Sequence, residues 1–253
     1  MAKLIPAAQL YTVREFIKTP EEIRESLTKI RKMGYTSVQV SGMGEMDPQA
    51  FKELIDELDL TVCATHSPFE KMQQDPKSVA DYHLLWGCPN VGLGGMPAEY
   101  RGSEEGFRAF AKAANEVGKA MQQYGLKFVY HNHNFEFAKF NGKRGYDILM
   151  EETDPDCVGF IMDTYWVQSG GCDPVEYIYK LAGRMDVIHF KDYAVDGFTP
   201  CFAAVGEGNL NFEKIVKACK DTGVRWAAVE EDVCPRDPFD CLETSLKNIN
   251  ALL

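Results

Sequence analysis

Short apolar runs alternate along the chain with longer segments whose apolar residues recur at helical spacing. The short runs are rich in Val, Ile, Phe and Ala and are too brief for typical helices, so they indicate buried strands. Strands that are apolar throughout, with helices between them, are typical of a parallel sheet that is covered on both faces. The predicted strands cover residues 4–11, 36–40, 60–65, 90–93, 126–131, 158–162, 187–190 and 226–229.

Helix starts are marked by capping residues that are followed by proline or acidic residues. Thr19-Pro20-Glu21-Glu22 combines a cap, a proline in the first turn and acids that complement the helix dipole. Asp47-Pro48, Ser103-Glu104-Glu105 and Asp173-Pro174 repeat parts of this pattern. The predicted helices cover residues 19–33, 47–58, 75–87, 103–125, 146–153, 211–222 and 238–253, with one more that begins at residue 173.

Eight strand–helix units in 253 residues predict one α/β domain, a single (β/α)₈ TIM barrel over residues 1–253. A doubly wound open sheet is the alternative, but no Gly-rich dinucleotide loop follows the first predicted strand. In a barrel of this kind the functional residues lie at the carboxyl ends of the strands. The strand ends are therefore where chemistry is expected.

Composition narrows the classes of partner. The net charge is −11, from 27 basic and 38 acidic residues, and it opposes nonspecific nucleic-acid binding, which depends on Lys and Arg. No apolar run approaches the ~20 residues that span a bilayer, and residues 1–6 lack the features of a signal peptide. The eight cysteines contain no CxxC pair, so free thiols with structural or incidental roles are expected. We expect a cytoplasmic protein that binds neither nucleic acid nor membrane, and composition leaves a homo-oligomer open.

Four of the five histidines stand at the ends of predicted strands. His131 and His133 follow one strand and point the same way because strand side chains alternate between faces. His66 and His189 end two other strands, and His66 is expected to contact substrate rather than serve only in the core. His83 falls on a predicted helix, where a structural or surface role is expected.

Carboxylates join these histidines at the predicted barrel mouth. Asp163 follows an apolar strand, where a carboxylate is costly unless it is paired or bound to metal. Glu136 follows His133 in the chain. Strand alternation lets Glu230 face the barrel while Glu231 faces away, although the run Glu230-Glu231-Asp232 could also be a solvated acidic patch. Carboxylate and imidazole together suit one divalent ion such as Mn²⁺, Zn²⁺, Co²⁺ or Fe²⁺. A polar network without metal is the alternative.

The predicted barrel mouth contains further candidate residues, and two of them allow two interpretations each. Lys191 could anchor substrate or form only an exposed pair with Asp192. Trp166, just past Asp163, could stack on a sugar, although most tryptophans pack in the core or at its rim. The loop Gly206-Glu207-Gly208 matches neither common phosphate-binding pattern. Gln9 and Arg14 near the first strand complete the candidates.

In order and spacing, several short segments together resemble the xylose isomerase-like TIM barrels, the family of sugar phosphate isomerases and epimerases. The segments are Gln9-Leu10-Tyr11-Thr12-Val13-Arg14, Ala64-Thr65-His66, Tyr130 to Phe137, Met162-Asp163-Thr164, His189-Phe190-Lys191-Asp192, Gly206 to Phe212 and Val229-Glu230. The resemblance covers almost the whole chain and implies a metal set of Glu, Asp, His and Glu on strands five to eight. Asp163, His189 and Glu230 match it, and His131 stands at the usual glutamate position. Glu136 could fold back to supply the carboxylate instead.

The resemblance implies an enzyme that moves a proton next to a carbonyl of a keto-sugar or related polyol. We expect Glu230 to act with Glu136 or His131, while substrate contacts come from His66, His133, Lys191 and Trp166. A metal-dependent isomerase or epimerase is the first expectation. A dehydratase or lyase on a keto-cyclitol or 3-keto-sugar is the alternative, since inosose dehydratases of the family also carry His at the strand-five position. A sugar-binding barrel without turnover is the third hypothesis. A DNA-repair nuclease is disfavoured by the acidic charge and by Trp166, which replaces a family histidine.

Overall fold

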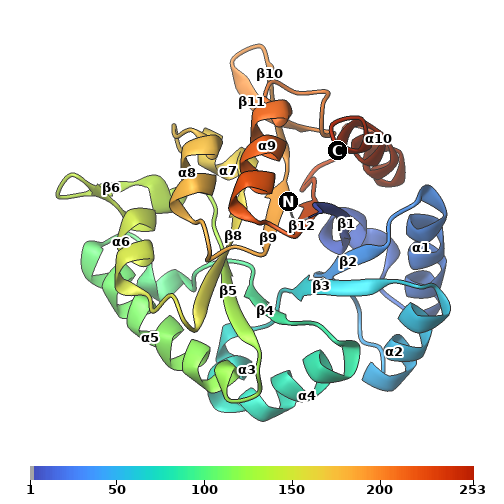
Figure 1. Cartoon of the computed structure of the whole chain (residues 1–253), viewed down its shortest axis with the longest axis horizontal. Coiled ribbons are helices and arrows are strands. Elements are labelled where there is room, and N and C mark those ends of the chain that lie inside the picture. The colour runs from blue at the N-terminus through green and yellow to red at the C-terminus, as the bar shows by residue number, and fades with distance from the viewer. Residues whose placement is uncertain (1–2) are drawn as a thin grey trace.

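The computed structural model describes residues 3–253 and confirms the predicted TIM barrel. Eight parallel strands run in the order β3-β2-β1-β12-β9-β8-β5-β4 (Figure 1). The barrel is nearly closed, because hydrogen bonds join β3 and β4, the two strands at the ends of this order. Ser67 N–H donates to Gly92 O at 2.8 Å, and the Asn90 side chain donates to Cys63 O at 2.9 Å. The barrel strands are β1 (Ile5–Gln9), β2 (Ser37–Val40), β3 (Thr61–Thr65), β4 (Asn90–Leu93), β5 (Lys127–His131), β8 (Val158–Asp163), β9 (Val187–Phe190) and β12 (Trp226–Val229).

Helices surround the strands (Figure 1). The first, α1, has the predicted capping box, in which Glu22 N–H donates to Thr19 Oγ1, and it ends at Gly34, whose φ of 113° favours glycine. Every helix predicted from the sequence is present. The helices are α1 (Pro20–Met33), α2 (Pro48–Glu57), α3 (Phe69–Gln74), α4 (Pro76–Trp86), α5 (Glu104–Gln122), α6 (Gly145–Glu152), α7 (Thr164–Ser169), α8 (Pro174–Lys180), α9 (Phe212–Thr222) and α10 (Pro238–Asn250).

The sequence pattern missed the short elements that follow several strands. The first strand ends at Gln9 rather than at residue 11, because the Gln9 side chain accepts the Tyr11 N–H and starts a 3₁₀ turn. Helices α3 and α7 are too short to show a clear period. The remaining unpredicted elements are η1 (Leu10–Phe16), η2 (Ala98–Tyr100), η3 (Phe135–Phe137) and the hairpins β6 (Lys139–Phe140) with β7 (Lys143–Arg144) and β10 (Asp192–Asp196) with β11 (Thr199–Ala203).

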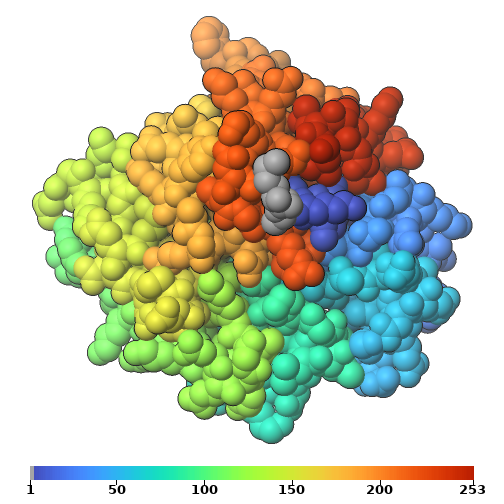
Figure 2. Space-filling model, viewed as in Figure 1, coloured from blue at the N-terminus to red at the C-terminus, as the bar shows by residue number. Residues whose placement is uncertain are grey.

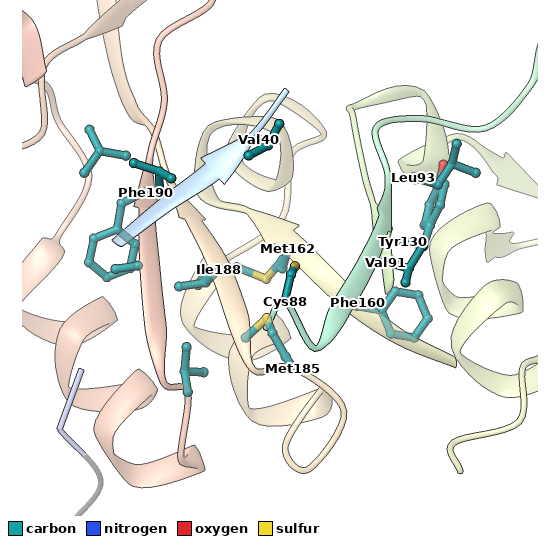
Figure 3. Packing of buried hydrophobic residues seen from close by; sticks show 14 of the residues in the cluster. Val40, Cys88, Val91, Leu93, Tyr130, Phe160, Met162, Met185, Ile188 and Phe190 are labelled. Atoms are coloured by element: carbon teal, nitrogen blue, oxygen red, sulfur yellow. The ribbon is translucent and has the colours of Figure 1, made fainter. Parts of the chain in front are cut away.

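Strand alternation divides the core into two layers. Outward side chains such as Tyr130, Phe160 and Ile188 pack between the sheet and the helices (Figure 3). Each such side chain contributes about 1.5–3 kcal/mol by leaving water. Inward side chains fill the barrel itself, and they are Ala7, Cys63, Ala64, Val129, Ile161, Val187, Trp226 and Ala228. The interior below the strand ends is therefore closed to ligands, so a binding site must lie at the mouth.

The face drawn in Figure 2 is the one at which the strands begin. The start of β1 (dark blue) and the start of β12 (orange-red) lie together near its centre, as the pairing of Ile5 with Trp226 requires. Because the strands are parallel, their carboxyl ends open on the opposite face. None of the helices described for residues 3–253 has the length and apolar character needed to cross a membrane.

Candidate active site

One layer of polar side chains closes the inside of the barrel at the carboxyl ends of the strands. Its members occupy the inward register, one step beyond the apolar interior, so strand alternation alone brings them together. All are buried, with at most 4% of any side chain exposed. They are Gln9, Gln39, His131, Asp163, His189 and Glu230.

Four members of this layer form a compact group of possible metal ligands. One donor atom each from His131, Asp163, His189 and Glu230 lies within 4.8 Å of the others. His131 Nε2 is 3.4 Å from Asp163 Oδ2, and His189 Nδ1 is 2.9 Å from Glu230 Oε2. The structure therefore brings together the residues that the sequence suggested as ligands.

Hydrogen bonds fix which nitrogen of each imidazole faces this group. His131 Nδ1–H donates to Gly94 O at 3.1 Å, so Nε2 is the nitrogen that faces Asp163. His189 Nε2–H donates to Gln39 Oε1 at 2.8 Å, so Nδ1 faces the carboxylates. A second ring nitrogen held in this way is typical of histidines that bind metal.

Gln39 also orients His66. Its Nε2 donates to His66 Nε2 at 2.9 Å, so His66 Nδ1 carries the proton that is shared with Ser41 Oγ at 3.1 Å. Burial, together with the nearby His131 and His189, lowers the pKa of His66 well below its usual value, so this ring is neutral. Sequence reasoning missed Gln39, although a polar residue at an inward position of the apolar run 37–40 is a visible signal.

Each carboxylate of the group has one oxygen held by the protein. Gln9 Nε2 donates to Glu230 Oε1 at 3.0 Å, and the Trp166 backbone N–H donates to Asp163 Oδ1 at 3.0 Å as the cap of α7. The second oxygens, Glu230 Oε2 and Asp163 Oδ2, point to the imidazoles. These hydrogen bonds restrict rotation of the Asp163 and Glu230 side chains, so their second oxygens stay close to the imidazoles.

The ammonium of Lys191 lies among three carboxylates. Its Nζ is 2.8 Å from Glu230 Oε2, 3.0 Å from Asp232 Oδ2 and 3.1 Å from Asp163 Oδ2. Burial lowers the pKa of Lys191, but the carboxylates outweigh it and hold the pKa well above its usual value. For Asp163 and Glu230 burial raises the pKa, but Lys191 and the imidazoles outweigh it and keep both ionised.

The alternative of an exposed Lys191–Asp192 pair is wrong, because the two side chains are 1% and 0% exposed and serve different partners. The Asp192 carboxylate accepts the N–H groups of Gly206, Gly208 and Leu210 at 2.9–3.1 Å. This explains the glycine-rich loop structurally. Its amide donors are taken by a carboxylate of the chain itself.

The structure does not bring Glu136 into the ligand group. Its Oε1 accepts the Tyr130 hydroxyl at 2.5 Å and its Oε2 accepts the His133 N–H at 3.0 Å. Burial raises the pKa of Glu136 to about 7, although both hydrogen bonds act in the opposite direction. Glu136 therefore stabilises the loop after β5 by accepting these two hydrogen bonds.

A cavity of about 550 Å³ opens beside the ligand group, a size that suits a small molecule. His133 lies at its wall with a buried Nδ1 that has no partner among residues 3–253. Burial lowers the pKa of His133 to about 3, so this ring is neutral. Trp166 packs 5.3 Å from the His133 ring rather than at the wall itself. The wall is formed by Tyr11, Arg14, Ser41, His66, Gly94, His131, His133, Glu230, Asp232 and Val233.

Gly94 and Gly95 allow the imidazoles to approach β4, a requirement that sequence reasoning missed. A Cβ at Gly94 would come within 2.9 Å of His66 Nδ1, and one at Gly95 within 3.1 Å of the His133 ring. The pair of adjacent glycines directly after a strand is the signal in the sequence.

The remaining histidine, His83, lies away from the cavity and is structural. Its Nδ1–H donates to Val79 O at 2.7 Å, and its Nε2 shares a hydrogen bond with Thr65 Oγ1 at 2.8 Å. The ring is fully buried.

The donor set fits a divalent ion. Two imidazole nitrogens and two carboxylate oxygens lie within 4.8 Å of one another. The charges of Asp163, Glu230 and Asp232 together exceed that of Lys191 by two. Nitrogen and oxygen donors of this kind suit Zn²⁺, Mn²⁺, Co²⁺ or Fe²⁺.

Comparison with known proteins gives consistent matches. The sequence profile of the xylose isomerase-like TIM barrel matches residues 27–250. The inosose dehydratase of Halalkalibacterium halodurans is 31% identical over 53% of this chain and 48% of its own length, and that of Lacticaseibacillus casei is 21% identical over 90% and 89%. A sugar phosphate isomerase/epimerase structure from Parabacteroides distasonis superposes with a TM-score of 0.81 at 26% identity, covering 98% of both chains. The resemblance drawn from the motifs is confirmed.

Proposed function

Because the chain belongs to the xylose isomerase-like TIM barrel family, we propose that it is a metal-dependent lyase. It removes a proton from the carbon next to the carbonyl of a small keto-cyclitol or keto-sugar and expels an oxygen substituent from the following carbon. The observation that carries this proposal is the arrangement of Glu230 and Lys191. Glu230 belongs to the ligand group and lines the 550 Å³ cavity, and its ionised carboxylate lies 2.8 Å from the buried ammonium of Lys191.

The ligands of the ion would be His131 Nε2, Asp163 Oδ2, His189 Nδ1 and Glu230 Oε2. When bound, a divalent ion at this point supplies Lewis acidity, which makes the proton next to a carbonyl more acidic. Gln9 and Gln39 keep the ligand atoms oriented.

Proton transfer falls to Glu230 in this proposal. Its pKa lies well below the usual value, so it is ionised at neutral pH and can accept a proton. Lys191 donates a hydrogen bond to the oxygen that gains negative charge as the carbon–oxygen bond breaks, and such a donor is most effective in a site that excludes water. The proton held by Glu230 and the oxygen that leaves with the bonding electrons make up the water or alcohol that is lost.

Three further residues would position the substrate. His66 and His133 are neutral and lie at the cavity wall, where they can exchange hydrogen bonds with hydroxyl groups. Among residues 3–253, the buried Nδ1 of His133 and the buried Nε1 of Trp166 have no hydrogen-bond partner, and the two rings lie 5.3 Å apart. A polyol ligand would satisfy such atoms at little cost.

The strand-five position carries His131 rather than a carboxylate, and this favours elimination over epimerisation. Inversion at a carbon needs one group to remove the proton and another on the opposite face to return it. His131 stands at the position where a carboxylate partner of Glu230 is expected, with its Nδ1–H given to Gly94. Glu136 is not among the residues that line the cavity, and its oxygens accept hydrogen bonds from Tyr130 and His133. A single base suffices for elimination.

Isomerisation is the second candidate, and the similarity to the Parabacteroides distasonis protein supports it. In this reaction Glu230 would return the proton to the neighbouring carbon of the same enediolate. The two reactions share the first step and differ in whether an oxygen substituent leaves.

The test is incubation of the manganese-loaded protein with keto-cyclitols, 3-keto-glycosides and ketoses in deuterated water, followed by NMR. Loss of water or alcohol together with the proton next to the carbonyl is expected. Glu230→Gln should slow this loss by about 10²–10⁴-fold, whereas Glu213→Gln on the exposed face of α9 should leave it unchanged. Deuterium uptake without elimination would replace the lyase by the isomerase. Binding without any exchange across the panel would refute both and leave a sugar-binding barrel.

A further inference from the structure

Glu231 points away from the cavity, and two thiols meet it there. Strand alternation turns its side chain to the opposite side from Glu230. The Sγ atoms of Cys234 and Cys241 and a carboxylate oxygen of Glu231 all lie within 4.8 Å of one another. Cys234 belongs to the loop after β12, and Cys241 lies in the first turn of α10.

The Glu231 carboxylate lacks the partners that a buried charge needs. The side chain is 2% exposed, and among residues 3–253 neither of its oxygens has a hydrogen-bond partner. Its position is nevertheless fixed, because its backbone N–H donates to Thr12 Oγ1 at 3.0 Å. A buried carboxylate without partners is costly, so its presence points to a ligand.

We propose that Glu231, Cys234 and Cys241 form a second metal site, for a thiophilic divalent ion such as Zn²⁺. Two thiolates and a carboxylate are ligands that zinc uses, with a fourth position left for water. Cys234 is only partly buried and gives solvent a path to the site. It is separate from the His131–Asp163–His189–Glu230 group, which contains no sulfur.

Binding at this site changes charge in a defined way. Each thiol loses its proton to solvent as its sulfur bonds to the ion. Two thiolates and the Glu231 carboxylate then surround a doubly positive ion and leave one excess negative charge. Arg236, which pairs with Glu207 at 2.8 Å, is the cation whose charge acts on Glu231.

The site would brace one wall of the cavity. The segment between Glu231 and Cys234 contains Asp232 and Val233, and both line the cavity. An ion held by Cys234 and Cys241 would tie this segment to α10. Such a role is structural and independent of the reaction proposed above.

Cobalt substitution tests the site because sulfur ligands have their own spectroscopic signature. The protein is reduced, freed of metal with a chelator and titrated with Co²⁺ under anaerobic conditions. A sulfur-to-cobalt charge-transfer band in the near ultraviolet is expected in the wild-type protein. The same band is expected in Asp163→Ala, which removes a ligand only from the other group.

Cys234→Ser should abolish the band and one bound ion per chain, while Cys201→Ser, a matched control with a partly buried cysteine on β11, should not. Glu231→Gln should keep the fold and weaken cobalt binding. No charge-transfer band in the wild type, or a band that persists in Cys234→Ser, would overturn the proposal. A Cys234–Cys241 disulfide that resists reduction, shown by six rather than eight reactive thiols after unfolding, would also overturn it. None of these three outcomes affects the lyase proposal, which the exchange assay tests separately.

Discussion

Replacing Lys191 with Met removes the ammonium that three buried carboxylates share. The distances from its Nζ to Glu230, Asp232 and Asp163 are 2.8, 3.0 and 3.1 Å, and Lys191 is 1% exposed. Methionine fills a similar volume, so the main change is electrostatic. Removing one partner of a buried ion pair costs about 3–5 kcal/mol because the other charge stays uncompensated. We expect Lys191→Met to lose that much stability when metal is absent.

The same substitution should have the opposite effect on metal binding. The ammonium repels a cation at the neighbouring ligand group, so its removal should tighten binding of Mn²⁺ or Zn²⁺. An ion that binds only the folded state stabilises it in proportion to RT ln(1 + [L]/Kd). Metal should therefore stabilise Lys191→Met more than the wild type, and the two proteins should differ less once saturated.

The assay is urea unfolding followed by circular dichroism, with excess chelator and with saturating Mn²⁺, together with a metal titration by calorimetry. Lys217→Met is the matched control, because Lys217 forms an exposed pair with Asp221 on α9 and its loss should leave both measurements unchanged. Equal midpoints of Lys191→Met and the wild type in chelator would refute the electrostatic reasoning. Unchanged metal affinity would refute the assignment of the ion to this group.

Three further predictions address other parts of the molecule. Glu230→Gln should lower kcat by about 10²–10⁴-fold in the elimination assay, and a loss of less than tenfold would remove Glu230 as the base. Gln39→Leu should weaken metal binding by about 10–100-fold, measured by competition with a fluorescent chelator, whereas the exposed Gln168→Leu should not. His83 has its pKa lowered from 6.5 to about 4 by burial, so the unfolded chain binds more protons between these values. Its contribution of about 3 kcal/mol is therefore complete above pH 6.5 and is lost as the pH falls toward 4. His83→Gln should flatten the dependence of the urea midpoint on pH in this window, and an unchanged slope would contradict the burial argument.

Residues at strand ends were predictable because one simple rule places them. His131, Asp163 and His189 follow apolar runs in the inward register, and parallel strands end at one mouth. Their approach to within 4.8 Å therefore follows from the positions of the strands. Gln39 obeys the same rule and was missed only because an amide carries less obvious chemistry than an imidazole.

Residues beyond the strand ends could not be placed from the sequence. Whether Glu136 enters the group depends on the η3 turn and on the Tyr130 hydroxyl that captures its carboxylate. The Asp192 carboxylate accepts hydrogen bonds from the N–H groups of residues 206, 208 and 210. These residues lie too far along the chain for a local sequence pattern to predict the contact. The meeting of Cys234 with Cys241 likewise depends on where α10 begins.

The end of β12 shows why side-chain positions are hard to predict from the sequence just beyond the end of a strand. The Glu230 N–H still donates to Phe190 O at 3.2 Å, so this residue continues the barrel ladder after the strand itself has ended. The Glu231 N–H donates instead to the Thr12 hydroxyl of η1 at 3.0 Å, which replaces the ladder by a side chain. The two consecutive glutamates are therefore anchored separately and point to opposite sides. A substitution at Thr12 would release only the second anchor, so it should disturb Glu231 and its two thiols before it disturbs Glu230 and the cavity.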